Sequence, residues 1–370
     1  MPESTIAPYS EVLIDAQSLH AFVVAIWQAA GSEAREAQLV ADHLVAANLA
    51  GHDSHGVGMI PRYMRACREG ELKLNGHAGL VRDAGAVLTV EGGRAFGQVV
   101  AYEAIERGIA RAKQLGICAL GLRNAHHIGR IGHWAEQCAQ AGLASFHFVN
   151  VAGDPLVAPF GGIDRRFGTN PFCAAFPRPG RPPLVLDFAT SAIAAGKVRV
   201  AFNKGVDAPA GALIDYDGAP TRDPGALFSE GQHGALLAFG GAVAGHKGSG
   251  LAAMCEIFAG ALTGGFTSHA ETLVTTNAIV NGMFSVIVNP EAFDAPARDD
   301  EADAFVDWLK ATRREPGVDA ILLPGEREDA TRRVRGASGI PVDKESWTQI
   351  VEAARAAGMS DAAIQPFLPR

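Results

Sequence analysis

The residue types best suited to chemistry gather in four short clusters of the sequence. The first is Asp53-Ser54-His55-Gly56, inside the run GHDSHGVGMIPRYM. A histidine titrates near neutral pH, and beside a hydroxyl and small glycines its imidazole can be presented to a ligand for proton transfer. A capped turn in which the histidine only satisfies backbone groups explains the same residues equally well.

The second cluster, RNAHHIG at 123–129, contains two adjacent histidines, His126 and His127. Neighbouring side chains on an extended chain point in opposite directions, so the pair cannot easily share a metal ion. Adding His133 gives no closed zinc pattern. We therefore predict no metal site, and we expect one histidine to face a cleft and the other to be structural.

The third cluster is the run LDFATS, in which Asp187 follows a buried apolar stretch. A carboxylate there is costly unless it is paired, so Asp187 is a candidate to orient a histidine and stabilise its imidazolium. Thr190 and Ser191 offer hydroxyl and backbone N–H groups to a phosphate. An N-cap for the helix that follows is the alternative, and both uses are compatible.

The fourth cluster, GHKGSG at 245–250, is predicted to open a helix. Glycines allow close backbone approach, a helix N-terminus attracts an anion, and Lys247 adds a positive charge, which together predict a phosphate or pyrophosphate cradle. A plain helix start with a solvated lysine is the alternative. The P-loop order is absent and no G-x-G-x-x-G follows a strand, which argues against a Rossmann site.

Apolar periodicity indicates the elements that must position these clusters. It predicts helices over 18–31, 32–51, 98–114, 131–141, 251–262, 299–312 and 343–358. It predicts strands over 86–91, 117–122, 144–149 and 184–188, and a long surface loop over the Gly-, Pro- and Asp-rich residues 203–229. The class is α/β or α+β, with helices at both ends of the chain.

Composition excludes several kinds of partner. The 370 residues are 48% hydrophobic and carry a net charge of −8, which suits one large or two modest domains and offers no basic stripe for nucleic acid. Five cysteines without a C-x-x-C fit a reducing compartment. The N-terminus does not resemble a signal peptide and no long apolar run appears, so we expect a cytoplasmic protein without a membrane partner.

The four clusters, with FGTNPF (167–172), DGAPTRDP (217–224) and PGERE (324–328), closely resemble the non-Rossmann malate/L-lactate dehydrogenase family. This sulfolactate/ureidoglycolate dehydrogenase-like family includes piperideine-carboxylate reductases. The resemblance implies hydride transfer between NAD or NADP and a small 2-hydroxy acid or 2-keto acid. It also implies an α/β fold with a mixed sheet, a helical domain (1–78 plus 299–370), a central domain (79–298) that binds cofactor and substrate, and a homodimer with its active site near the interface.

The resemblance also assigns roles to residues. His55 would be the general acid/base, with Ser54 and Asp187 completing its hydrogen-bonded relay, and His127 matches a second histidine that one branch uses instead. The residues matching cofactor contacts are Asn170, Leu186, Asp187, Phe188, Ala189, Thr190, Ser191, His246, Lys247, Gly248, Pro324, Gly325 and Glu326.

One position departs from the family pattern. Many members place an arginine four residues after the histidine, where it can clamp a substrate carboxylate, and here that position is Met59. This favours an alternative substrate, a cyclic imino acid of the piperideine- or pyrroline-2-carboxylate type. A distant alternative from another class is a metal-dependent hydrolase that uses the histidines His52, His55, His126, His127 and His246.

Overall fold

Packing divides the chain into two compact units. The computed structural model describes residues 11–153, 155–272 and 279–368. One unit joins the chain ends, residues 1–75 and 327–370, and the other holds residues 76–326. We expected 299–326 to accompany the ends, and this boundary is wrong. Helix α9 (Arg298–Lys310) is tied into the central unit because Asp303 accepts hydrogen bonds from Arg178 at 2.6 and 2.8 Å.

The terminal unit is mostly helical. Its elements are β1 (Glu11–Ile14), α1 (Ala16–Ala29), α2 (Ala34–Leu49), η1 (Asp53–His55), η2 (Val57–Met59), α3 (Ile60–Arg68), α10 (Glu326–Ser338), β12 (Ile340–Asp343), α11 (Lys344–Ala356), α12 (Asp361–Ile364) and η5 (Gln365–Phe367). Strands β1 and β12 pair antiparallel, and Phe22 of α1 stacks on Phe367 with ring centroids 4.9 Å apart. The two chain ends therefore share one core.

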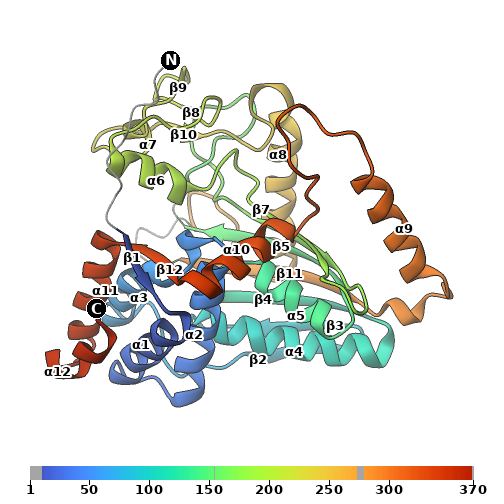
Figure 1. The fold of residues 1–370 in the computed structure, drawn as a ribbon, viewed down its shortest axis with the longest axis horizontal. Coiled ribbons are helices and arrows are strands. Elements are labelled where there is room, and N and C mark those ends of the chain that lie inside the picture. The colour runs from blue at the N-terminus through green and yellow to red at the C-terminus, as the bar shows by residue number, and fades with distance from the viewer. Residues whose placement is uncertain (1–10, 154, 273–278, 369–370) are drawn as a thin grey trace. The chain divides into compact units, whose positions relative to one another are not determined.

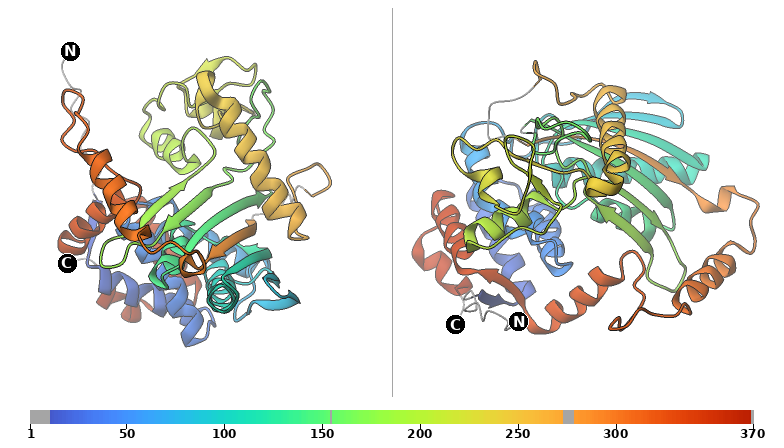
Figure 2. Two further views of the ribbon diagram at one scale, coloured as in Figure 1. Left: turned by 90° about the vertical axis from the view of Figure 1, so that its right-hand side faces the viewer. Right: turned by 90° about the horizontal axis from the view of Figure 1, so that it is seen from above.

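The central unit is built on a seven-stranded mixed sheet (Figure 1). Its strand order is β2 (Gly79–Ala84), β3 (Val87–Glu91), β4 (Ile117–His126), β11 (Val280–Val288), β5 (Ala144–Ala152), β6 (Phe172–Phe176) and β7 (Leu184–Phe188). Only β3 and β4 run parallel. Helices α4 (Gly97–Leu115) and α5 (Gly132–Gln140) cover one face, and α8 (Gly241–Cys255) lies on the other (Figure 2).

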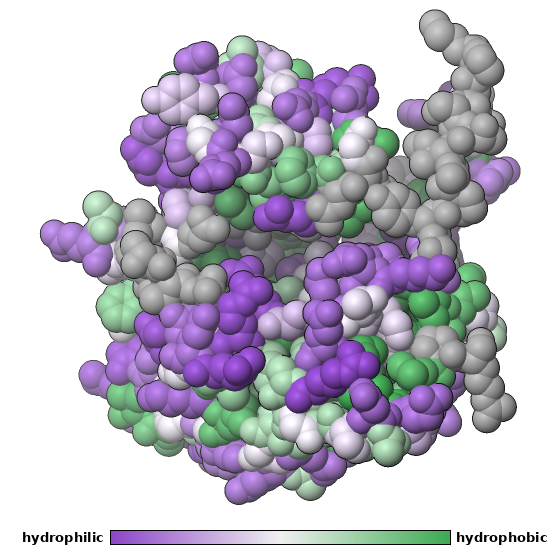
Figure 3. Space-filling view, turned by 90° about the vertical axis from the view of Figure 1, so that its left-hand side faces the viewer, coloured by the Kyte–Doolittle hydropathy of each residue, from purple (hydrophilic) through white to green (hydrophobic). Residues whose placement is uncertain are grey.

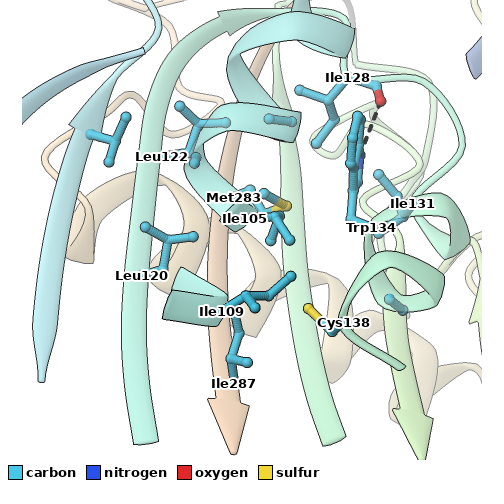
Figure 4. Packing of buried hydrophobic residues seen from close by; sticks show 14 of the residues in the cluster. Ile105, Ile109, Leu120, Leu122, Ile128, Ile131, Trp134, Cys138, Met283 and Ile287 are labelled. Carbon is cyan, nitrogen blue, oxygen red and sulfur yellow. Dashed lines mark hydrogen bonds between the residues drawn. The ribbon is translucent and has the colours of Figure 1, made fainter. Parts of the chain in front are cut away.

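The main core fills the space between the sheet and helices α4 and α5. Figure 4 shows Ile105 and Ile109 of α4 pointing toward Leu120 of β4 and Met283 of β11. Trp134 of α5 is fully buried, and its indole N–H donates to the carbonyl of Ile128 at 3.1 Å. This bond satisfies the polar atom of a large buried ring and fixes α5 to the loop before it.

The predicted surface loop over 203–229 contains a small subdomain, so that prediction is wrong. Its elements are α6 (Ala195–Lys204), β8 (Leu213–Ile214), β9 (Pro220–Thr221), α7 (Gly225–Phe228) and β10 (Ala235–Leu236), with β8 central in a three-stranded sheet. Leu213 and Leu236 are fully buried and pack with Val198. Apolar residues spaced among many glycines and prolines were sufficient for this second core.

Helix α8 begins at Gly241, ten residues before the predicted start at 251. It continues without a break into a π-helical segment, η3 (Glu256–Leu262). The chain then passes to β11, the short turn η4 (Pro290–Ala292) and α9.

The outer surface mixes residue types, and on the face drawn in Figure 3 hydrophilic side chains are interspersed with smaller hydrophobic patches. Among the described residues, no helix combines the length and the apolar character that a membrane crossing requires.

Candidate active site

His55 lies in a short turn that Asn48 holds from inside the terminal unit. The Asn48 side chain is 3% exposed; its Nδ2 donates to Asp53 Oδ1 at 2.6 Å, and its Oδ1 accepts from the Val57 N–H at 2.8 Å. A Cβ added at Gly56 would lie 2.1 Å from Asn48 Oδ1, so only glycine allows the amide this close. One amide therefore bridges both sides of His55.

Arg335 of α10 holds the same turn from the other end of the chain. Its guanidinium binds both carboxylate oxygens of Asp53, at 2.6 and 3.0 Å, and also donates to the Asn48 carbonyl. Such bidentate pairs fix orientation as well as contributing energy. The turn leaves His55 half-buried and Ser54 exposed, as a group that must meet a ligand requires.

The second cluster is mainly structural. Arg123 Nε and Asn124 Nδ2 each donate to Glu91 at 2.8 Å, which ties the ends of β4 and β3 together. His126 and His127, at the end of β4, are 1% and 8% exposed. His127 is the more accessible of the two histidines.

Asp187 lies near the carboxyl end of β7 and turns toward α5. Its Oδ2 accepts from the Gly132 N–H at 2.8 Å and lies 3.6 Å from Arg130 Nε. Because side chains alternate along a strand, Leu186 and Phe188 face the opposite side of the sheet. The N-cap alternative for the following helix is wrong, since α6 is capped by Ala194 without a side-chain bond.

Thr190 and Ser191 do not offer their hydroxyl hydrogens to a ligand, contrary to our expectation. The Thr190 hydroxyl donates to the carbonyls of Thr169 and Asn170, at 3.2 and 2.9 Å, and its N–H donates to the Thr169 carbonyl at 3.0 Å. The Ser191 hydroxyl donates to the Ile193 carbonyl at 2.8 Å. Both side chains are buried and fix the shape of this loop.

The GHKGSG run lies inside α8, so its predicted role as a helix N-terminus is wrong. Gly248 instead allows close packing, since an added Cβ would lie 2.3 Å from the Phe239 carbonyl oxygen. The Ser249 hydroxyl accepts from the Phe160 N–H at 3.1 Å. His246 and Lys247 are exposed on the helix surface, so the lysine charge stays available to a ligand.

Two regions of the central unit bond to the chain in and around β7, one at each end of the strand. The Thr190 carbonyl accepts from the Phe239 N–H at 2.7 Å, just before α8 begins. At the other end of the strand, the Val185 N–H donates to the Pro324 carbonyl at 3.2 Å. Within one unit, the chain just before α8 therefore adjoins residues 186–191 at the carboxyl end of β7, and the 324–326 turn adjoins the start of β7.

Glu326 closes that turn. Its Oε2 accepts from the Leu323 N–H at 3.0 Å, and its Oε1 pairs with Lys310. Burial opposes ionisation, but the hydrogen bonds from Leu323 and Lys310 outweigh it and lower the pKa of Glu326. The side chain thus holds the turn in shape.

Asn170 belongs to a buried polar network rather than to an open surface. It is fully buried; its Nδ2 donates to Glu256 Oε1 at 2.8 Å and its Oδ1 accepts from the Val151 N–H at 3.1 Å. Asn150 Nδ2 and the Ser268 N–H donate to the other oxygen of Glu256, at 3.0 and 2.9 Å. This network joins the π-helical segment to the sheet.

The predicted site residues are divided between the two units. Ser54 and His55 belong to the terminal unit, whereas His127, Asp187 and Lys247 belong to the central unit. Within the described parts of the chain, no group of three or more His, Cys, Asp or Glu side chains is arranged to hold a metal ion.

Comparison with known proteins agrees with this architecture. Residues 14–351 match the family model described as malate/L-lactate dehydrogenase. The chain belongs to the malate/L-lactate dehydrogenase family. Membership makes it a CH–OH oxidoreductase and implies a nicotinamide cofactor in general.

Individual relatives of this dehydrogenase family member cover nearly its whole length. Hydroxycarboxylate dehydrogenase B of Escherichia coli K12 is 56% identical over 354 residues, 95% of this chain and 96% of that protein. A solved E. coli structure assigned to the malate/lactate dehydrogenases superposes with a TM-score of 0.92 at 55% identity, covering 96% and 98% of the two chains. The Δ1-piperideine-2-carboxylate reductase structure from Pseudomonas syringae gives 0.80 at 29% identity, covering 92% and 99%.

Proposed function

We propose that the protein uses NAD or NADP to interconvert a small 2-hydroxy acid and its 2-keto acid. The observation that carries this proposal is that residues 186–191 adjoin the chain just before α8 at one end of β7, while the 324–326 turn adjoins the other end. The family resemblance matches residues 186–191 and 324–326 to cofactor contacts, and the 56% identity to a hydroxycarboxylate dehydrogenase supports the substrate class.

The residues around β7 fit a dinucleotide. Leu186, Phe239 and Val243 are 41%, 51% and 92% exposed, and they offer apolar surface that planar rings would cover. Lys247, exposed on the same helix as Val243, provides a point charge for a phosphate. When bound, the nicotinamide supplies the acceptor or donor of the hydride.

In this mechanism His55 moves one proton. It takes the proton from the substrate hydroxyl oxygen during oxidation and returns it during reduction, the role for which an imidazole side chain is suited. Asp187 orients the imidazole and stabilises its protonated form. Ser54 extends this relay, and His127 is the alternative acid/base.

The first test measures thermal stability with NADH and NADPH separately. A ligand that binds the folded state raises the melting temperature, so a shift with one of them identifies the cofactor. Absorbance of the reduced nicotinamide is then followed over a panel of 2-hydroxy and 2-keto acids. Absence of any shift, together with absence of turnover, contradicts the proposal.

A cyclic imino acid is the second candidate substrate, and Met59 favours it. A methionine cannot provide the bidentate clamp of an arginine, so the substrate carboxylate must be held differently. Likeness to a Δ1-piperideine-2-carboxylate reductase supports the same class. Faster turnover of a piperideine- or pyrroline-2-carboxylate than of any 2-keto acid would identify it.

We further propose that the protein works as a cytoplasmic homodimer. The family resemblance supports the homodimer, and five cysteines without a C-x-x-C, which fit a reducing compartment, support the location. Light scattering on the purified chain distinguishes a dimer from a monomer.

A further inference from the structure

Asp187 is held by the start of α5, more than fifty residues before it in the chain. The Gly132 N–H donates to Oδ2 at 2.8 Å, and Arg130 Nε lies 3.6 Å from the same oxygen. Two groups that restrain one carboxylate oxygen give the other oxygen a defined direction. A carboxylate that must orient a neighbouring ring requires this restraint.

Arg130 is an unexpected residue at this position. Its side chain is 2% exposed, and its two terminal nitrogens donate to Glu136 at 2.8 and 3.1 Å. A buried cation is costly, and a positive charge beside a helix N-terminus is disfavoured by the helix dipole. Burial opposes the charged form, but Glu136 and Asp187 outweigh it and raise the pKa of Arg130 further. The arginine remains charged between two carboxylates.

Gly132 is required by the same arrangement. A Cβ added there would lie 2.5 Å from Arg130 Nη2 and 2.8 Å from Asp187 Oδ2. Any side chain at 132 would therefore displace the guanidinium or the carboxylate. Glycine therefore allows both the hydrogen bond from its N–H to Asp187 and the close approach of the Arg130 side chain.

Arg130 and, through it, Glu136 are charged groups next to Asp187 in the structure. Cross-strand register places Cys173 beside Asp187, and His147 beside Cys173. Burial, aided by the charge of Asp187, raises the pKa of the Cys173 thiol well above its usual value. Burial lowers the pKa of His147 to about 3. Both residues are therefore neutral at physiological pH.

We propose that Arg130 and Gly132 are positioning residues that hold Asp187 as a fixed, ionised carboxylate. The inference rests on the proposed function, in which Asp187 orients the acid/base histidine. Arg130 offsets the repulsion between Glu136 and Asp187, and Gly132 fixes the direction in which Asp187 points.

A double-mutant cycle tests the coupling. We expect R130M to lower kcat about 10- to 100-fold with little change in cofactor affinity, and to lower it less than about threefold when D187N is already present. The matched control is R298M, because Arg298 also binds two carboxylates, Glu291 and Asp299, at 2.9 Å each. An equal loss from R130M in both backgrounds overturns the proposal.

A second measurement does not depend on turnover. Carboxyl 13C NMR, with the Asp187 resonance assigned by its loss in D187N, follows the titration of this group in the full chain. R130M should raise the pKa of Asp187, R130K should raise it less, and R298M should leave it unchanged. If the titration midpoint of the Asp187 carboxyl is the same as wild type in both Arg130 variants, the proposal is overturned. If the NMR shift appears but no 2-hydroxy acid or imino acid is turned over, the proposed function fails and the positioning role stands.

Discussion

At the scale of single residues, the site depends on side chains that fix other side chains. A buried polar residue holds the turn that carries His55, and another lies beside Asp187: Asn48 in one unit and Arg130 in the other. In both cases a glycine, Gly56 or Gly132, leaves the space that the holding residue occupies. The groups proposed to act in catalysis are thus positioned by partners to which we assign no chemical step.

Replacing His55 tests the proposed proton transfer. H55A should lower kcat about 10²- to 10⁴-fold, the usual contribution of a positioned general acid or base, while cofactor binding measured by fluorescence titration stays near the wild-type value. H20A is the matched control, since His20 also belongs to the terminal unit and pairs with Asp42 at 2.7 Å. Near-normal turnover of H55A would transfer the role to His127.

Replacing Arg335 tests the clamp around His55. R335M removes the two bonds to Asp53 and the bond to the Asn48 carbonyl but keeps the Asn48 side-chain bonds, so the turn should loosen and kcat should fall about 10-fold or more. R332M is the control on the same helix, because its partner Asp329 is a local i,i+3 neighbour. Equal kinetics of the two variants would show that Arg335 does not position His55.

At the scale of elements, a buried polar cluster links strands β5 and β11 of the central sheet. His147 of β5 is fully buried, and its ring nitrogens bond to the Ser285 and Ser145 hydroxyls at 2.8 and 2.9 Å. Burial disfavours the charged imidazolium and lowers the pKa of His147 to about 3. The folded state therefore prefers the neutral ring.

This preference predicts a loss of stability in acid. In the unfolded chain His147 takes up a proton near the ordinary histidine pKa of 6.5, whereas in the folded chain it does so only near 3. Between these pH values the unfolded state binds more protons than the folded state. The contribution of the neutral ring to the free energy of unfolding is therefore complete above pH 6.5. It is lost as pH falls toward 3, by up to about 1.4 kcal/mol per pH unit. The free energy of unfolding, measured in urea at several pH values, should change less steeply with pH for H147Q than for wild type. The exposed H233Q should show the same pH dependence as wild type.

Elements with a one-sided apolar pattern could be predicted from the sequence, and the others could not. Helices α1, α4 and α5 lie within two residues of their predicted bounds. Helix α10 was missed because none of its residues is buried, and β2 because all six of its residues are exposed. The start of α8 was missed because its Gly- and Ala-rich first turns carry no apolar stripe.

The candidate site could be predicted only in part from the sequence. The clusters around His55 and Asp187 could be recognised because their residue types are local in the sequence. Arg335 and Arg130 were missed, since each acts on a residue more than fifty positions away and no spacing records the contact. The buried amide Asn48 left one weak signal, a polar residue in the apolar run that ends α2.

At the scale of the whole molecule, catalysis by the proposed scheme needs both units. Ser54 and His55 are contributed by one unit, and Asp187 with the cofactor segments by the other. We expect the isolated central segment, residues 76–326, to keep any cofactor binding that β7 and α8 provide but to have no turnover. Titration with the preferred cofactor and a rate assay on the same sample measure both properties, and turnover by this segment alone would exclude His55 as the acid/base.

The position of β11 also determines when this protein can finish folding. Strand β5 ends at residue 152, but the strand that lies between it and β4 begins only at residue 280. During synthesis, β4 and β5 leave the ribosome long before their common neighbour, so each exposes an unpaired edge in the meantime. The nascent chain therefore passes through a prolonged aggregation-prone stage, and its yield in the cell should depend on chaperones that shield those two edges until Val288 has emerged.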